Sequence, residues 1–482
     1  MTGHRDFQRL VVVSNRLPVV LRRDEQGQWV VRPGEGGLVT ALAPVLRDRG
    51  GIWIGWPGTD DEEAVEQVRA MTGQAGYQLL PVPLTAEDER GYYHGFSNET
   101  LWPLFHDLVG HCRYEPAHWQ VYRGVNRRFA QVVADSTTEE DYVWVQDYHL
   151  LLVAGFLREL GVKRRLGFFL HIPFPALDIF SKLPWRKQVL EAMLAYDLIG
   201  FQTPRDRRNF IQCVRSLLHG SQHEGRGYLG TLRVGDRQVR VGHFPIGIDA
   251  RKFASEAASA PVSEQAWYIH EALPKRQIVL GIDRLDYTKG IPERLRAVGN
   301  ALERFPELRR QITFVQVVVP SRVGVGDYRQ QRRSIEQLVG KINGKFTSSG
   351  WTPVHYIYRA LTWHELLAYY RTCEIALLTP LKDGMNLIAK EYCVCSVESG
   401  VLILSEFAGA AKQLQQGALL VNPNDIEGTA EALRQAFHMP HAERKRRMRR
   451  MQREVHRHDV FWWVDLFLNA AFGRRLADFP AA

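Results

Sequence analysis

Short runs of apolar, largely β-branched residues recur along the chain, and each run is followed by turn residues and then by a helical pattern. Such continuous apolar runs are typical of strands in a parallel sheet that is covered by helices on both faces. The pattern therefore predicts two series of strands. The first comprises residues 10–13, 52–54, 142–145, 166–170 and 198–201, and the second comprises residues 278–280, 312–319, 355–358, 375–378, 401–404 and 419–421.

The segments between these runs carry helical periodicity. Leu190, Met193 and Leu194 share one face of a predicted helix, and Leu338 and Ile342 share one face of another. Strands that alternate with helices place the chain in the α/β class. Two such series predict two Rossmann-like, doubly wound domains that face each other across a cleft. In this arrangement ligands bind at the carboxyl ends of strands, so candidate functional residues are sought directly after strands.

A turn-rich, polar stretch separates the two series, with Gly242, Pro245 and Gly247 at its start. We therefore place an N-terminal domain at residues 1–245 and a C-terminal domain at residues 246–456. The remaining residues, 457–482, contain an aromatic helix that we expect to pack back on the N-terminal domain.

Composition excludes several classes of protein. Of the 482 residues, 45% are hydrophobic and 24% are charged, which is ordinary for a packed protein and too apolar for a disordered one. No apolar run approaches the ~18 residues of a membrane span. The N-terminus has only a four-residue apolar run, Leu10–Val13, where a signal peptide needs ~7–15. The five scattered cysteines favour reduced thiols, so we expect a cytoplasmic protein without a structural zinc site or a membrane partner.

The net charge of +9 raises the question of a polyanionic partner. Residues 441–457 carry eight of the basic side chains and two acidic ones, and this segment is the basis for a nucleic-acid-binding alternative. Met448, Met451 and Val455 share one helical stripe, however, which predicts a helix that docks an apolar face and leaves its arginines in solvent. We expect no nucleic-acid partner.

Polar residues follow several of the predicted strands. Arg16 comes after the first strand, and Gly36 and Gly37 open the next helix, where backbone N–H groups can approach a phosphate. The same glycines are equally typical of a structural turn. Asp147 and His171 follow two neighbouring strands; a single such histidine would be typical of a hydrogen-bonded core residue, but the pair favours a site.

Cationic and acidic residues also follow the predicted strands of the second series. Arg284 and Lys289 lie in one tight loop and can converge on a diphosphate, although surface pairing with a nearby aspartate is the alternative. Arg322 follows a long buried strand. Asp383 precedes a glycine turn that opens a helix and can hold sugar hydroxyls, and Glu391 lies about two turns into that helix, where it can accept hydrogen bonds from a ribose diol.

These residues belong to short motifs that occur in a fixed order. The motifs are Ser-Asn-Arg16, Gly-Gly37, Tyr93-x₂-Phe-Ser-Asn-x₂-Leu-Trp102, Asp147-Tyr-His-Leu, His171-x-Pro-Phe-Pro, Arg284-Leu-Asp-Tyr-x-Lys289, Ser-Arg322 and Asp383-Gly-Met-Asn-Leu-x₃-Glu391. In order and spacing the chain resembles the trehalose-6-phosphate synthases, which are retaining glycosyltransferases of family 20 with two Rossmann-like domains in the arrangement called GT-B. The resemblance covers nearly the whole chain.

The resemblance implies a donor site for UDP-glucose in the C-terminal domain. Arg284 and Lys289 match the pair that binds the diphosphate and takes up leaving-group charge, and Gly37 matches the loop glycine that closes over it. Glu391 matches the ribose ligand, and His171 matches the histidine beside the transferred sugar. The segment that matches the contact to the donor glucose comprises Asp383, Gly384, Met385, Asn386 and Leu387.

The resemblance also implies an acceptor site for glucose 6-phosphate, with its ligands mostly in the N-terminal domain and Arg322 as the exception in the C-terminal domain. The matching residues are Arg16, Tyr93, Trp102 and Arg322, with Asp147 as the carboxylate near the reacting sugars. Two arginines, a tyrosine hydroxyl and an indole N–H suit a phosphomonoester, which carries about −1.5 to −2 charges at pH 7. We expect front-face attack with retention, without a nucleophilic carboxylate, a metal or a cofactor.

Several alternatives stay open. A relative in the same family would use another acceptor, such as glycerol 3-phosphate in a glucosylglycerol-phosphate synthase, or another donor nucleotide. A protein of a different class would be a non-catalytic regulator or would bind nucleic acid. The chain ends at Ala482 without a segment for a fused phosphatase, so we expect a separate phosphatase to act downstream. A homo-oligomer is compatible with the resemblance.

Overall fold

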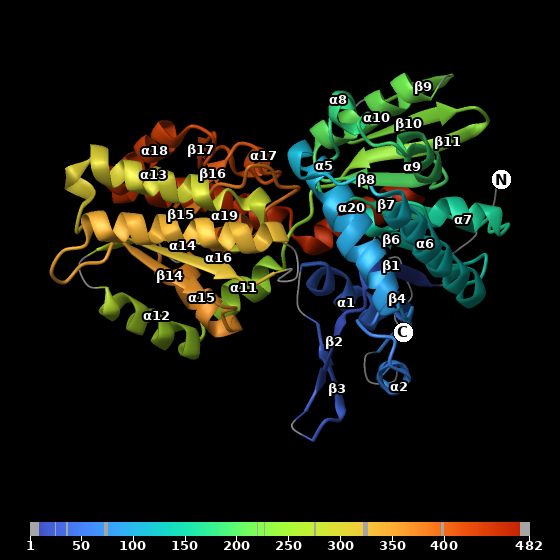
Figure 1. The fold of residues 1–482 in the computed structure, drawn as a ribbon, viewed down its shortest axis with the longest axis horizontal. Helices are drawn as coiled ribbons and strands as arrows, with labels where there is room; N and C mark the ends of the chain where they lie inside the picture. The colour runs from blue at the N-terminus through green and yellow to red at the C-terminus, as the bar shows by residue number, and fades with distance from the viewer. Residues whose placement is uncertain are drawn as a thin grey trace. The chain divides into compact units, whose positions relative to one another are not determined.

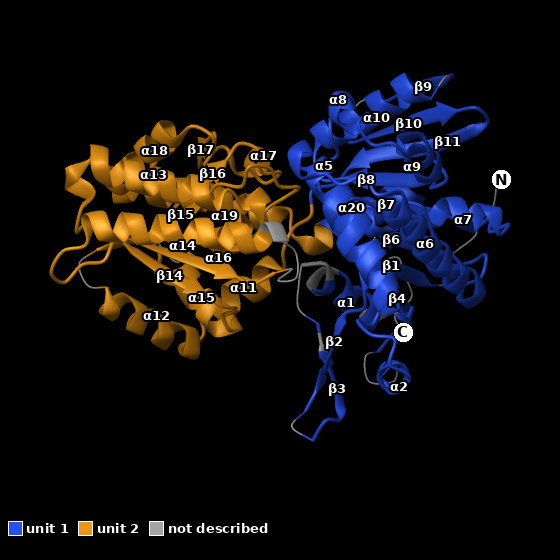
Figure 2. Cartoon of the chain, in the orientation of Figure 1, with its two compact units in different colours: residues 1–245, 463–482 blue, residues 246–462 orange. Residues whose placement is uncertain are grey.

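The structure is a computed structural model, which describes residues 9–24, 26–34, 37–71, 76–218, 220–225, 227–273, 276–321, 326–396 and 400–472. The chain divides into two compact units (Figure 2). Unit 1 comprises residues 1–245 and 463–482, and unit 2 comprises residues 246–462. Each of the eleven predicted apolar runs forms a strand, so the prediction of an α/β fold with parallel sheets is confirmed.

Unit 1 is built on a nine-stranded sheet with the strand order β5-β4-β1-β6-β7-β8-β11-β10-β9. Strands β5 to β11 in this order are parallel, and β10 and β9 add antiparallel strands at one edge. A separate antiparallel hairpin pairs β2 with β3. The strands are β1 (Leu10–Arg16), β2 (Val19–Arg23), β3 (Trp29–Pro33), β4 (Ile52–Trp56), β5 (Gln78–Pro81), β6 (Tyr142–Gln146), β7 (Leu166–Phe169), β8 (Leu198–Phe201), β9 (Ser221–Glu224), β10 (Leu229–Val234) and β11 (Arg237–His243).

Helices cover this sheet, as Figure 1 shows. The longest is α6, which packs against the π-helical segment η1 and against α7. Strands β4 and β6 are buried at every position, which explains why their sequences are apolar up to Gln146 at the end of β6. The helical elements of this unit are α1 (Gly37–Arg49), α2 (Glu62–Ala70), α4 (Ala86–Asp88), η1 (Glu89–Leu101), α5 (Trp102–Phe105), η2 (Val109–His111), α6 (Pro116–Ser136), η3 (Tyr148–Leu150), α7 (Val153–Glu159), α8 (Leu177–Phe180), α9 (Arg186–Met193) and α10 (Pro204–Leu217).

The last described helix, α20 (Val460–Phe472), contributes its residues from Trp463 onwards to unit 1. The ring of Phe467 stacks on that of Trp144 in β6, with centroids 4.2 Å apart, and Trp463 lies 5.1 Å from the same ring. Gly200 in β8 leaves space for this packing, because a side chain there would press on Phe169 and Phe467. The aromatic residues of α20 are therefore part of the unit 1 core.

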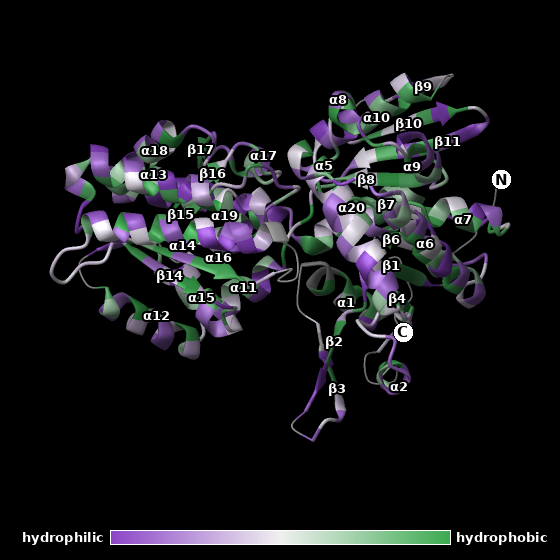
Figure 3. Ribbon diagram, viewed as in Figure 1, coloured by the Kyte–Doolittle hydropathy of each residue, from purple (hydrophilic) through white to green (hydrophobic). Residues whose placement is uncertain are grey.

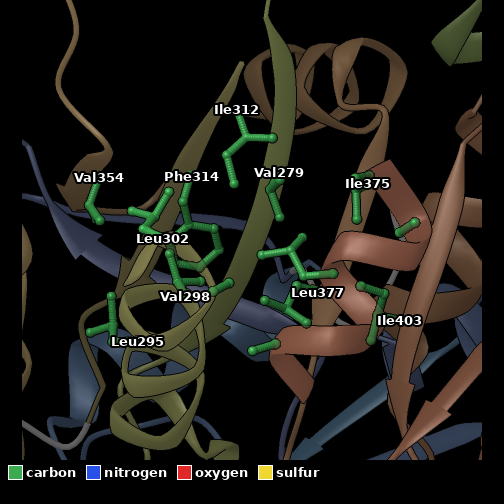
Figure 4. Close-up of a cluster of buried hydrophobic side chains, with 14 of the residues drawn as sticks. Val279, Leu295, Val298, Leu302, Ile312, Phe314, Val354, Ile375, Leu377 and Ile403 are labelled. Carbon is green, nitrogen blue, oxygen red and sulfur yellow. The ribbon is translucent and has the colours of Figure 1, made fainter. Parts of the chain in front are cut away.

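Unit 2 is built on a six-stranded parallel sheet with the order β14-β13-β12-β15-β16-β17. Side chains from α13 interlock with those of the central strands, as Val298 and Leu302 do with Val279 and Phe314 (Figure 4). The strands are β12 (Gln277–Arg284), β13 (Ile312–Val319), β14 (Val354–Tyr358), β15 (Ile375–Leu378), β16 (Val401–Ser405) and β17 (Leu419–Val421).

The helices of unit 2 form two groups. Helices α14, α13 and α18 pack in a row on one face of the sheet, and α12, α15, α11, α16 and α19 contact one another in a second group. The helical elements are α11 (Ala250–Ala257), α12 (Ala260–Ala272), η4 (Tyr287–Lys289), α13 (Ile291–Arg304), η5 (Pro306–Leu308), α14 (Gly326–Phe346), α15 (Trp363–Thr372), α16 (Leu387–Cys395), α17 (Ala411–Leu414), α18 (Ile426–His438) and α19 (His441–Arg457).

Helix α19 has the amphipathic character that its sequence predicts (Figure 3). Met448, Met451 and Val455 are buried, and most of the basic side chains are accessible. Arg444 differs from the prediction that the arginines lie in solvent. It is buried and donates hydrogen bonds to the carbonyl oxygens of Ala436, Phe437 and Met439, because the carbonyl groups at the end of α18 need donors.

No helix in the described residues is long and apolar enough to cross a bilayer. The five cysteines are all free thiols, and four of them are buried.

Candidate active site

Arg16 stands at the carboxyl end of β1 in unit 1. Its guanidinium lies over the indole of Trp56, 3.7 Å from the ring centroid. A side chain at residue 58 would overlap the same guanidinium, so Gly58 leaves the space that Arg16 occupies. Stacking fixes the plane of the guanidinium while the side chain remains exposed, which suits a fork that binds an anion.

Aromatic side chains form a wall beside Arg16. Tyr93, on η1, meets Trp56 edge-on with centroids 6.1 Å apart and stacks on His149 at 5.8 Å and an interplanar angle of 10°. Trp102 begins α5, where its ring packs 5.7 Å from that of Tyr148 and is only 5% exposed. Tyr93 is therefore the more accessible of the two predicted acceptor ligands.

Buried hydrogen bonds hold this wall in place. The hydroxyl of Tyr92 donates to Asn15 Oδ1 at 2.9 Å, and the hydroxyl of Tyr148 donates to Asn98 Oδ1 at 2.9 Å. Asn98 in turn donates to the carbonyl oxygen of Tyr93 at 2.7 Å. Sequence reasoning assigned no role to Tyr92 or Tyr148, because nothing in the sequence shows which tyrosines of a motif point inward.

Asp147 follows β6 with a backbone φ of +71°, which is rare for a residue with a side chain. Its backbone N–H donates to the carbonyl oxygen of Phe169 at 2.8 Å, and its Oδ1 accepts from the backbone N–H of His171 at 3.2 Å. Such a conformation costs of order 1–3 kcal/mol and persists because neighbouring contacts impose it. The carboxylate of Asp147 thereby joins the ends of β6 and β7.

His171 lies directly beyond β7, with its Nε2 2.9 Å from Gln146 Oε1. With Nε2–H donated to that oxygen, Nδ1 is left as a hydrogen-bond acceptor. Burial lowers the pKa of His171 to about 3, so the imidazole is neutral at pH 7. A neutral ring packed against Phe169 at 4.7 Å suits a hydrogen-bonding role better than that of a cationic phosphate ligand.

A cavity of about 570 Å³ opens at the carboxyl ends of β1 and β6 in unit 1. This volume lies within the range of about 300–1,000 Å³ that small-molecule sites occupy. Of the predicted site residues, the cavity is lined by Arg16 and Asp147, together with His149, Trp29 and Gly58; Tyr93, Trp102 and His171 are not among its lining residues.

The second group of predicted residues lies in unit 2, where a tight loop follows β12. Arg284 ends the strand and is exposed. Asp286 accepts hydrogen bonds at Oδ1 from the backbone N–H and the hydroxyl of Thr288, both at 2.9 Å. Gly290 then adopts a φ of +61°, where a side chain would also overlap the carbonyl oxygen of Thr379. Glycine is required at this position because of both the conformation and the close approach.

Lys289 in this loop is paired with Asp383, with Nζ 2.6 Å from Oδ2. Both side chains are largely enclosed, with exposed fractions of 12% and 14%. The sequence alternative was a pair with a neighbouring aspartate, but the partner lies 94 residues away, after β15. An anion that enters the loop competes with Asp383 for Lys289.

The segment after Asp383 forms a turn that begins α16. Asn386 has a φ of +73° and caps the helix, since its Oδ1 accepts from the backbone N–H of Ala389 at 3.1 Å. Its Nδ2 donates to Asp383 Oδ2 at 3.3 Å. Met385 is buried, and its carbonyl oxygen accepts from the backbone N–H of Ala410 at 2.7 Å. The turn is therefore held by the side chain of Asn386 and by the backbone of Ala410.

Glu391 lies in the second turn of α16 and accepts a hydrogen bond from the hydroxyl of Tyr370 at 2.9 Å. Burial raises the pKa of Glu391 to about 7, so it is poised between its two protonation states. The neighbouring Lys390 is buried and donates to the carbonyl oxygen of Ile246 at 2.6 Å, and burial lowers its pKa to about 7. Neither Tyr370 nor Lys390 was predicted as part of the site.

Four predicted residues remain. Gly384 lies in the turn after Asp383, and Leu387 begins α16. Gly37 begins α1, and Arg322 lies outside the described residues. Across the described ranges, no group of three or more histidine, cysteine, aspartate or glutamate side chains is arranged to hold a metal ion.

Two α/β units with parallel sheets, each with polar and charged side chains beyond its strand ends, are typical of enzymes that bind nucleotides and other small ligands at those ends. Within this class it is a glycosyltransferase, and the chain belongs to glycosyltransferase family 20, whose family model matches residues 8–472.

Named relatives lie close in sequence. A trehalose-6-phosphate synthase from Mycolicibacterium smegmatis is 44% identical over 476 residues, which cover 98% of this chain and 93% of that protein. A trehalose-6-phosphate synthase from a Mycobacterium species, strain KMS, is 43% identical over 99% of this chain and 97% of its own length.

Solved structures resemble the chain over its whole length. An α,α-trehalose-phosphate synthase (UDP-forming) from Burkholderia xenovorans, in complex with glucose 6-phosphate, matches with a TM-score of 0.85 and 35% identity over 96% of this chain and 99% of that one. An E. coli structure bound with UDP-2-fluoro glucose matches with a TM-score of 0.85 and 34% identity over 98% of this chain and 100% of that one.

Proposed function

We propose that the protein transfers glucose from UDP-glucose to glucose 6-phosphate, with retention, to form α,α-trehalose 6-phosphate. The observation that carries the proposal is the pair of Lys289 and Asp383, because a sugar diphosphate needs a cation for its phosphates and a carboxylate for its sugar hydroxyls at adjoining positions. The named relatives and their ligands support the choice of donor and acceptor.

The donor site lies in unit 2. Arg284 and Lys289 bind the diphosphate, and the turn from Asp383 to Leu387 holds the glucose. Glu391 accepts the ribose hydroxyls. When the donor enters, its phosphates replace Asp383 beside Lys289, and the released carboxylate becomes available to the sugar hydroxyls.

The acceptor site lies in unit 1. Arg16 binds the acceptor phosphate as a planar fork, with Tyr93 beside it. The family motif implies one further cation, Arg322, which belongs to the sequence of unit 2. Asp147 lies in the same cavity as Arg16 and accepts hydrogen bonds from acceptor hydroxyls. His171, neutral at pH 7, hydrogen-bonds the transferred sugar, and Trp102 supports the acceptor wall.

The reaction follows a front-face path that needs no nucleophilic carboxylate. The bond between the anomeric carbon and the diphosphate oxygen breaks, and the acceptor hydroxyl attacks the same face as its proton passes to the departing phosphate oxygen. The charges of Arg284 and Lys289 stabilise the departing diphosphate, so we propose a metal-independent reaction. Activity that persists in excess EDTA supports this step, and activity that EDTA abolishes and Mg²⁺ restores contradicts it.

A substrate matrix tests the proposed function. The purified protein is offered UDP-, GDP- or ADP-glucose with glucose 6-phosphate or glycerol 3-phosphate, and products are identified by NMR, including the anomeric configuration. We expect α,α-trehalose 6-phosphate from UDP-glucose and glucose 6-phosphate. Fast turnover of another pair, with no trehalose 6-phosphate, would instead identify a relative with a different acceptor or donor.

We further propose a cytoplasmic location and no nucleic-acid partner. Free thiols, four of them buried, suit a reducing compartment. The accessible arginines of α19 are compatible with a solvated helix face. Binding to random duplex DNA that weakens steeply with salt would contradict this assignment.

Replacing Arg16 with alanine is expected to raise the KM for glucose 6-phosphate by about 10- to 100-fold, because a charge-assisted contact contributes roughly 1.5–3 kcal/mol. The KM for the donor is expected to change little. Arg22 → Ala is the matched control, since Arg22 is an exposed arginine on the nearby hairpin that does not line the cavity. A donor KM that rises as much as the acceptor KM would contradict this role of Arg16.

Binding of UDP is expected to strengthen as the pH rises from 6 to 8. Because the pKa of Glu391 is raised to about 7, the side chain is mostly protonated at pH 6 and must ionise to accept two ribose hydroxyls. The pH dependence should flatten in Glu391 → Gln, apart from the titration of UDP itself. Glu374 → Gln is the control, because the pKa of Glu374 is also raised by burial but its carboxylate accepts from the backbone of Ile278. Calorimetry at three pH values measures the difference.

A further inference from the structure

Arg294, on α13, is a fully buried arginine with 1% of its surface exposed. It lies beneath the loop that carries Lys289 but belongs to none of the motifs singled out in the sequence. A buried arginine needs hydrogen-bond acceptors for its five N–H groups. Its contacts therefore show which segments of the chain it connects.

The guanidinium of Arg294 joins four segments of unit 2. Its Nη1 lies 2.7 Å from Asp283 Oδ2, in the residue before Arg284 at the end of β12. Its Nη2 donates to the carbonyl oxygen of Lys289 at 3.2 Å. It also donates from Nε to Thr379 Oγ1 at 3.1 Å, beyond β15, and from Nη1 to Gln316 Oε1 at 3.3 Å, on β13.

The surrounding backbone is shaped for this arginine. A side chain at Gly281 in β12 would press on Gln316 and on the guanidinium of Arg294, so glycine leaves the space for both. The loop is also held from above: the carbonyl oxygen of Thr288 accepts from the backbone N–H of Leu381 at 2.8 Å. Arg294 thus contacts the backbone of the loop at Lys289, and Leu381 contacts it at Thr288.

The charges around Arg294 form an alternating series. The Asp283 carboxyl is paired with Arg294 and also interacts electrostatically with Lys289, which is itself paired with Asp383. Burial raises the pKa of Asp283, while the positive charges of Arg294 and Lys289 oppose that rise. A buried ion pair contributes little net stability because desolvation offsets its attraction, but its geometry is well defined.

We propose that Arg294 and Asp283 are positioning residues that hold Lys289 and Arg284 at the site of the donor phosphates. Arg294 acts through the carbonyl group of Lys289, and Asp283 acts through the backbone that it shares with Arg284. The expected effect on the affinity for a nucleoside diphosphate rests on the proposed function. The expected effect on the order of the loop does not.

The first test measures the loop itself and needs no ligand. Hydrogen exchange is compared between the native protein and the variants Arg294 → Met and Asp283 → Asn, the second being isosteric and the less disruptive to folding. We expect exchange of the amides in residues 285–291 to accelerate at least tenfold. Unchanged exchange there in both variants would overturn the proposal.

Arg444 → Met is the matched control, because Arg444 is another buried arginine of unit 2 that donates several hydrogen bonds to backbone carbonyl groups. Its loss should loosen residues 436–439, whose carbonyl groups it binds, and leave residues 285–291 unchanged. Loosening of residues 285–291 by this variant as well would show a general loss of stability and overturn the proposal.

The second test is a double-mutant cycle with UDP as the ligand. If Arg294 acts through Lys289, Arg294 → Met weakens UDP binding at least tenfold in the native background and less than about threefold when Lys289 is already alanine. Equal losses in both backgrounds would overturn the proposal. If UDP does not bind the native protein at all, the donor of the proposed function is wrong, and the hydrogen-exchange result alone decides the positioning role.

Discussion

Replacing Lys289 with alanine is expected to lower kcat by about 10²- to 10³-fold while the protein stays folded. A preorganised charge that acts on a developing oxyanion contributes this much when it is removed. The Lys289 ammonium is preorganised, because its loop is held by the carbonyl contacts of Arg294 and Leu381 and its charge is fixed beside Asp383. The loss should appear mainly in kcat, since the charge on the leaving group grows in the transition state.

Lys345 → Ala is the control for this prediction. Lys345 makes an ion pair of the same kind in the same unit, with Nζ 2.7 Å from Glu303 Oε1, but both side chains are exposed on α13 and α14. Exposed pairs contribute about 0–1 kcal/mol, so its removal should leave kcat and the melting temperature nearly unchanged. A Lys289 → Ala protein with near-normal turnover would refute the role given to this lysine.

The second large effect is expected at a glycine that contacts no substrate. Gly409 → Ala should reduce donor affinity by about 10- to 100-fold, because a Cβ there would overlap the carbonyl oxygen of Gly384. The turn cannot easily yield, since Gly409 donates to the carbonyl oxygen of Asp383 at 3.1 Å and Ala410 donates to that of Met385. Overpacking of this kind costs about 1–3 kcal/mol and shifts backbone, which would carry Asp383 away from Lys289.

Gly340 → Ala provides the comparison for that variant. Gly340 lies in α14 with no atom within 4 Å of where its Cβ would stand, so alanine should be neutral or stabilise the helix by about 0.5–1 kcal/mol. UDP affinity and urea unfolding are measured for both variants. Normal UDP affinity in Gly409 → Ala would mean that the turn can shift without disturbing the donor site.

The apolar strands were predictable because strands of a parallel sheet that is covered on both faces are continuously apolar. Other short elements show such continuous apolar sequence less consistently. The strands that were not predicted lack a continuous apolar sequence. β9, the edge strand, is Ser-Gln-His-Glu, and β10 beside it largely alternates between buried and less buried positions. The hairpin of β2 and β3 pairs outside both large sheets, so its residues carry no signal of a two-sided core.

The sequence predicts which candidate residues follow the strand ends. It does not predict which side chains pair with one another. Parallel strands bring their carboxyl ends to one edge, so Arg284, Lys289 and Asp383 could be grouped in one unit from the sequence. That Lys289 pairs with Asp383, and not with Asp283, depends on how β12 and β15 lie side by side. Tyr370 reaches Glu391 for the same reason, because α15 and α16 pack together, and only tertiary structure determines which faces meet.

The contribution of α20 to unit 1 bears on how the chain is made. Unit 2 is continuous in sequence, so all of its strands have left the ribosome once residue 462 has emerged. Synthesis of unit 1 begins first but ends last. The ring of Phe467, which stacks on Trp144, is synthesised 323 residues after it. The core of unit 1 is therefore completed only after the whole of unit 2 has been synthesised, although most of unit 1 is translated first.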